Sequence, residues 1–173
     1  MSNVAPEYKW VTAWFADARS KVDVAGLKGK IPCVLVEVEL KKDNPVENVV
    51  KIWRWADHKR VAKRVLFLHA FSAHYRLAVS ISAAQPTKVK QPSKIKQFER
   101  AVFVGHRMKQ DHALKIDYKD LLIQTTTRAG KLIPYKPRMR RGAVTKEGGA
   151  AMHRAAETLA NTIAKLLRSR SHR

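Results

Sequence analysis

Three carboxylates in the first part of the chain have the types and spacing that could bind a divalent metal. Glu37 and Glu39 lie two positions apart in the apolar segment IPCVLVEVELK, and Asp23 precedes them. Because successive residues of a strand point to opposite faces, Glu37 and Glu39 share one face. Two neighbouring carboxylates repel each other and lose hydration, and a hard cation such as Mg²⁺ would offset that cost. The pattern therefore predicts a metal site in which Asp23, across a hairpin, is the third ligand.

A purely structural interpretation of the same residues stays open. An edge strand with one solvated face could carry Glu37, Glu39 and Lys41 without any function, with Glu39 and Lys41 as a same-face charge pair. The apolar surroundings of the two glutamates and the scarcity of acids elsewhere favour the metal site. Asn48, Lys51 and Arg54 recur at helical spacing in the next segment. We expect Lys51 to contact a phosphate or water there, and Asn48 and Arg54 to lie on a solvated helix face.

The elements that must position these residues alternate between helix and strand. Asn44, Pro45 and Glu47 are typical of a helix start, with Val46, Val49, Val50 and Trp53 as its apolar stripe. Val34, Val36 and Val38 should face the core, opposite the glutamates. The expected elements are a helix over 6–20, strands over 21–30 and 31–41, a helix from 44, a strand over 63–71, a helix over 93–110, a strand over 113–126 and a helix over 149–168. This order predicts an α/β fold with a mixed central sheet flanked by helices.

The order of these motifs resembles the PD-(D/E)xK nuclease superfamily, which has the restriction-endonuclease-like fold. The similarity covers about residues 1–70 and rests on a hairpin Asp, a strand Glu-x-Glu and a following helix. The resemblance implies that Asp23 and Glu37 bind one or two Mg²⁺ ions and that Glu39 positions or deprotonates the attacking water. A second register, with Asp23, Glu39 and Lys41 as the motif, also fits. Val22 departs from the proline that often precedes the aspartate in this superfamily.

Composition points to a polyanionic partner. The 173 residues include 35 Lys and Arg against 14 Asp and Glu, a net charge of +21, and 45% are hydrophobic. A protein this basic binds polyanions unless something prevents it. The excess lies mainly in the second half, and a basic tract over residues 128–141 could contact phosphates, with a tyrosine that could stack on a base. The nucleic-acid-binding candidates of this tract are Arg128, Lys131, Tyr135, Lys136, Arg138, Arg140 and Arg141.

These observations define one expected organisation and two classes of function. We expect a nuclease-like α/β core over 1–126, a basic loop over 127–148, and a C-terminal helix and basic tail over 149–173. The first function is a Mg²⁺-dependent endonuclease that prefers DNA over RNA and that could act as a homodimer. Its expected catalytic residues are Asp23, Glu37, Glu39, Lys41 and Lys51. The alternative is a non-catalytic nucleic-acid-binding protein. With no stretch near the about 20 apolar residues of a membrane span, we expect no membrane partner and a cytoplasmic location.

Overall fold

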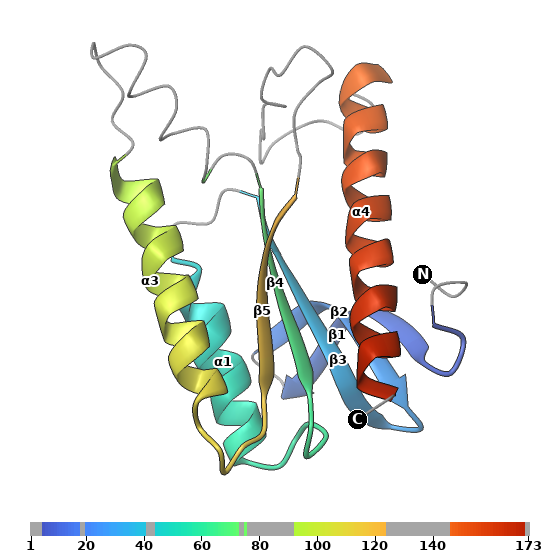
Figure 1. Cartoon of the computed structure of the whole chain (residues 1–173), viewed down its shortest axis with the longest axis vertical. Helices are drawn as coiled ribbons and strands as arrows, with labels where there is room; N and C mark the ends of the chain where they lie inside the picture. The colour runs from blue at the N-terminus through green and yellow to red at the C-terminus, as the bar shows by residue number, and fades with distance from the viewer. Residues whose placement is uncertain are drawn as a thin grey trace.

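The computed structural model describes residues 5–17, 20–40, 44–72, 75, 92–123 and 146–171. Strands and helices within these residues form a mixed sheet covered by helices on both faces, which confirms the mixed α/β class (Figure 1). In chain order they are β1 Lys9–Asp17, β2 Ser20–Lys28, β3 Ile31–Glu39, α1 Val46–Asp57, β4 Leu66–Ser72, α3 Pro92–Lys109, β5 Asp117–Ile123 and α4 Lys146–Ser171.

The sheet has the spatial order β1-β2-β3-β4-β5. The first three strands pair antiparallel, and β4 and β5 then continue parallel to β3. Gly29 turns the chain from β2 into β3 with a φ of 61°, a conformation that suits glycine. Parallel neighbours need a crossover connection, and α1 and α3 supply the two that this sheet requires.

The two largest hydrophobic cores lie on opposite faces of the sheet. In Figure 1, α1 and α3 lie side by side on one face and α4 covers the other. Val49, Ile52 and Trp55 of α1 pack in the first core, and Leu159 and Ile163 of α4 pack in the second. The central strands are therefore buried on both faces, and every residue of β4, LFLHAFS, is buried. No helix in the described ranges is long and apolar enough to cross a membrane.

The expected helix over 6–20 is wrong, because Lys9–Asp17 forms the edge strand β1. Lys9 pairs with Leu27, and the ladder continues along the hairpin partner β2. Trp10 packs in the core beneath α4, whereas Trp14 packs in the core beneath α1. Between them Ala13 has a φ of 51°, an irregularity that accompanies this change of face. The spacing of the two tryptophans, which resembles a helix, therefore comes from an irregular strand.

Helix α1 begins at Val46, with Pro45 instead of the expected Asn44 at its N-cap and no side-chain cap hydrogen bond, and it turns a different side to the sheet. Its buried residues are Asn48, Val49, Ile52 and Trp55, whereas Val50 of the expected stripe is 52% exposed. Burial of Trp55 and Ile52 removes more apolar surface from water than burial of the valines would, which favours this rotation. The rotation also brings Asn48 under the sheet.

The remaining elements agree with the expected order. The strands near 63–71 and 113–126 and the helix near 93–110 are confirmed as β4, β5 and α3. Helix α4 begins at Lys146, before the expected position 149, so residues 146–148 of the expected basic loop are helical. The rest of that loop, with Arg128, Lys131, Tyr135, Lys136, Arg138, Arg140 and Arg141, lies outside the described residues.

Helix α3 approaches β5 so closely at Gly105 that there is no room for a side chain at this position. A Cβ added at Gly105 would come 2.1 Å from the Tyr118 ring, which is fully buried. We expect Gly105→Ala to lower the free energy of unfolding by about 1–3 kcal/mol, although alanine favours helices, because overpacking a core has about this cost. Urea denaturation measures the change. In a Tyr118→Ala background the same substitution should cost nothing, and an equal loss there would show that the Tyr118 contact is not the cause.

Candidate active site

The carboxylates lie where β2 and β3 separate. The antiparallel ladder between these strands ends at the pair Val24 and Val36. Beyond that pair, Asp23 replaces the missing ladder bond, because its Oδ2 accepts a hydrogen bond from the Val38 amide at 2.8 Å. Asp23 and Glu37 are the first residues past the end of the ladder, so the fork places these two acidic residues on neighbouring strands, and the charge of Asp23 acts on Glu37.

The alternation expected for β3 is confirmed. Val34 and Val36 are fully buried against α4, and Val38 packs at the edge of the same core. Glu37 and Glu39 point to the opposite face, toward α1, where they are only 4% and 2% exposed. Both faces of β3 are therefore closed to solvent at this point. The solvated edge strand considered for Glu37 and Glu39 does not occur, because β3 is a central strand.

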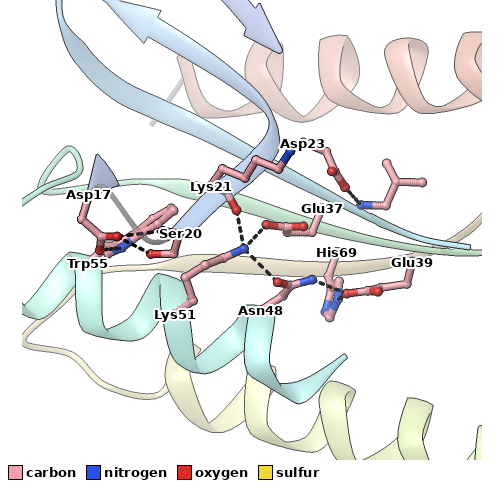
Figure 2. A network of polar contacts seen from close by, with 11 residues as sticks. Asp17, Ser20, Lys21, Asp23, Glu37, Glu39, Asn48, Lys51, Trp55 and His69 are labelled. Atoms are coloured by element: carbon pink, nitrogen blue, oxygen red, sulfur yellow. Dashed lines mark hydrogen bonds and ion pairs between the residues drawn. The ribbon is translucent and has the colours of Figure 1, made fainter. Parts of the chain in front are cut away.

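Lys51 of α1 holds Glu37 (Figure 2). Its ammonium group donates to Glu37 Oε1, to the Lys21 carbonyl oxygen at 2.6 Å and to Asn48 Oδ1 at 2.8 Å, so all three of its hydrogens have acceptors. Burial raises the pKa of Glu37 to about 7, and the charges of Asp23 and Glu39 add to the rise, although Lys51 opposes it. Glu37 is thus a buried carboxylate whose ionisation the surrounding cation only partly supports.

Glu39 has a separate set of partners. Its Oε1 accepts a hydrogen bond from Asn48 Nδ2 at 2.5 Å and lies 3.0 Å from His69 Nε2. His69 is fully buried on β4, and its Nδ1 lies 3.4 Å from the Tyr118 hydroxyl. The tautomer with hydrogen on Nε2 satisfies all these groups, since His69 then donates to Glu39 and accepts from Tyr118. Burial also raises the pKa of the Tyr118 phenol, which keeps it a donor.

A continuous chain of polar contacts therefore joins the core to the fork. Asn48 donates to Glu39 and accepts from Lys51, and Lys51 in turn donates to Glu37. This series of contacts fixes the two glutamates of β3 relative to helix α1, and each donor group in it has an acceptor. Such fully satisfied buried networks rigidify the elements that they join.

The structure brings together part of the expected site. Asp23, Glu37, Glu39 and Lys51 lie on one region of β2, β3 and α1, although the three carboxylates make different contacts. Among the residues that the structure describes, no group of three or more His, Cys, Asp and Glu side chains could hold a metal ion. Lys41, the alternative motif residue, lies outside the described residues.

Two residues of the network were not expected from the sequence. The expected solvated position of Asn48 is wrong, because α1 buries it to 6% exposure beside Glu39. Arg54 does remain on the solvated face, with a side chain 55% exposed, and pairs with Asp17 at 3.2 Å. His69 was missed, although a lone histidine in the apolar strand LFLHAFS indicates a buried group that needs a partner.

Comparisons with known proteins add no family to this description. Neither the protein-family models, nor the curated proteins, nor the solved structures contain a match to this chain.

Proposed function

We propose that this protein is a metal-dependent phosphodiesterase that cleaves DNA. The observation that carries the proposal is the fork of β2 and β3, where Asp23 lies beside a buried Glu37 whose pKa is raised to about 7. Burying a carboxylate next to other carboxylates is costly, and functional sites are where such perturbed groups concentrate. The positive charge of the whole chain supports a phosphodiester substrate.

The donor set at the fork fits a hard cation. Asp23 and Glu37 carry oxygen ligands of the kind that Mg²⁺ takes, and a cation there would offset the burial that chiefly raises the pKa of Glu37 as well as the smaller repulsion from Asp23 and Glu39. The chemistry supplied by bound Mg²⁺ is Lewis acidity at the scissile phosphate and a lowered pKa of the attacking water. We assign Asp23 and Glu37 as ligands of one or two such ions.

The chain's own residues complete the proposed site. Lys51 holds Glu37 in place, and its positive charge would act on a bound phosphate electrostatically, because its three hydrogens already have protein acceptors. Glu39, held by Asn48 and His69, is the proposed residue for positioning or deprotonating water. The order of hairpin Asp, strand Glu-x-Glu and crossover helix supports our proposal of a restriction-endonuclease-like fold.

Incubation with supercoiled plasmid DNA tests this function directly. Nicked or linear product should form with Mg²⁺ or Mn²⁺ and should not form with EDTA. A structured RNA in parallel tests the proposed preference for DNA. If no divalent metal supports cleavage of either nucleic acid, the phosphodiesterase assignment is wrong.

A second candidate is a nucleic-acid-binding protein without catalysis. The observation that favours it is that Glu37 and Glu39 already have protein partners, namely Lys51 for the first and Asn48 with His69 for the second. These contacts could hold the fork together in a purely structural role. Tight binding of DNA in EDTA, together with no cleavage in any divalent metal, would establish this alternative.

Either function requires a phosphate-binding surface, and the sequence places one in the basic tract. Replacing Arg138, Arg140 and Arg141 with alanine should weaken DNA binding and lower the slope of log K against log salt by up to about 3, because each lost phosphate contact releases one counterion fewer. Gel-shift titrations at several salt concentrations measure this slope. The control is a second triple alanine variant, which removes three exposed positive charges elsewhere on the chain, at Lys63, Lys165 and Arg168. Equal effects of the two triple variants would show that the tract is not the specific surface.

A further inference from the structure

The outer face of α3 carries an aromatic side chain that the fold does not use. Phe103 is 60% exposed, the highest value among the large hydrophobic residues of the described part of the chain. The inner face of the same helix supplies the packing, with Ala101 and Met108 fully buried and Gly105 against Tyr118. Figure 1 shows α3 as an outer layer beside α1, with nothing described beyond it. Phe103 therefore contributes little to the stability of the cores.

Cations accompany this exposed ring along one side of the helix. The Arg107 guanidinium lies 5.4 Å from the Phe103 ring centroid. Because each helical residue advances by about 100°, Lys96, Arg100 and Arg107 all fall within about 60° of Phe103 on the same side. All three are exposed. Glu99 and His106 lie on the other side of the ring, so the positive stripe is continuous.

We propose that this face of α3 binds a single strand of nucleic acid, with Phe103 stacked on an unpaired base. Base stacking on an aromatic ring combined with a basic track is how sequence-tolerant single-strand binding is achieved. Arg107, already over the ring, can contact both the stacked base and a phosphate. A second copy of this chain is a poor occupant, because each copy carries a net charge of +21. The proposal does not depend on cleavage at the β2–β3 fork. Binding at this face of α3 would direct single-stranded segments to the protein.

Binding of a fluorescent single-stranded DNA of about 16 nucleotides tests the proposal. Fluorescence anisotropy is measured in EDTA, so that the result is independent of any cleavage. Phe103→Ala should weaken this binding at least about fivefold, and Phe103→Tyr should restore it, because tyrosine keeps the ring. Binding of the corresponding duplex should change far less, since its bases are already stacked.

Phe15 provides a matched control on another part of the surface. It is 57% exposed and has Lys21 6.0 Å from its ring centroid, so Phe15→Ala removes a similar cation–aromatic pair. Phe15→Ala should leave single-strand affinity nearly unchanged. Arg107→Ala should lower the salt slope for the single strand by about 0.7, as expected for one phosphate contact.

Three results would overturn this inference. The first is that Phe103→Ala affects single-strand binding no more than Phe15→Ala does. The second is that Phe103→Ala weakens duplex and single-strand binding equally, which would remove the stacked base from the explanation. The third is that Phe103→Ala abolishes binding to phosphatidylserine-containing vesicles but leaves DNA binding intact, which would identify α3 as a membrane-surface helix instead.

Discussion

Glu37→Gln is expected to abolish DNA cleavage while leaving the protein at least as stable as the wild type. Even residues that only orient metal ligands cost about 10–100-fold in activity when they are lost, so loss of a direct ligand should cost more than about 100-fold. The amide cannot ionise, and the folded protein is therefore relieved of a carboxylate whose pKa is raised to about 7 by burial and by its acidic neighbours. DNA binding in EDTA should persist, since the proposed phosphate contacts lie on other parts of the chain.

Thermal melts with and without Mg²⁺ separate this result from a structural role of Glu37. Mg²⁺ should raise the Tm of the wild type and not that of Glu37→Gln, because only the former keeps both ligands. Glu47→Gln is the matched control, since Glu47 is an exposed carboxylate of α1 that accepts a hydrogen bond from Asn44. If Mg²⁺ stabilises neither protein and Glu37→Gln lowers the Tm, Glu37 acts only as the partner of Lys51.

The second large effect is expected for Lys51→Met, and it should depend on pH. Removing one partner of a buried ion pair costs about 3–5 kcal/mol, because the remaining charge is left without compensation. Lys51 and Glu37 have side chains only 12% and 5% exposed, but Glu37 can escape an uncompensated charge by taking up a proton, which limits the loss for this pair. At about pH 8, one unit above the Glu37 pKa of about 7, the folded wild type has Glu37 ionised, whereas the variant keeps it protonated, so the loss there should exceed the loss at pH 5 by up to about 1.4 kcal/mol. At about pH 5 Glu37 is protonated, so the loss should fall to about 1 kcal/mol.

The wild type itself should show the titration of Glu37 in the absence of metal. In the folded protein Glu37 keeps its proton up to about pH 7, whereas its ordinary pKa is 4.5. The folded state then binds more protons than the unfolded state between these values, so the free energy of unfolding falls as pH rises through this window. Glu37→Gln should remove this part of the pH profile. Urea denaturation in EDTA at several pH values measures both effects.

Arg54→Met controls for the loss of a positive charge from α1. Arg54 lies one turn beyond Lys51 and also pairs with a carboxylate, Asp17, but its side chain is 55% exposed. Such exposed pairs are worth at most about 1 kcal/mol. Arg54→Met should therefore be nearly neutral at both pH values. A pH-independent loss in Lys51→Met would show that the hydrogen bonds of Lys51 to the Lys21 carbonyl oxygen and to Asn48, rather than the ion pair with Glu37, stabilise the fork.

The sequence alone determined the elements whose signals are local. The β-branched run of residues 31–39 and the glycine turn before β3 follow from neighbouring residues, and the structure contains them, whereas the helix expected from Asn44 begins at Val46 with Pro45 at its N-cap. The alternation along β3 also follows from strand geometry, so the shared face of Glu37 and Glu39 could be predicted. The mixed α/β class followed from the order of these elements.

Only the tertiary structure decided which partners these residues meet. Strand β1 exists because β2 pairs with it, and that non-local pairing overrides the helical spacing of Trp10 and Trp14. The rotation of α1 about its axis is set by packing against the sheet, and it alone makes Asn48 a partner of Glu39. His69 reaches Glu39 across 30 residues of sequence, because β4 lies parallel to β3. Spacing along the chain specifies the face of an element, whereas the partner of that face depends on how the hydrophobic surfaces of distant segments pack together.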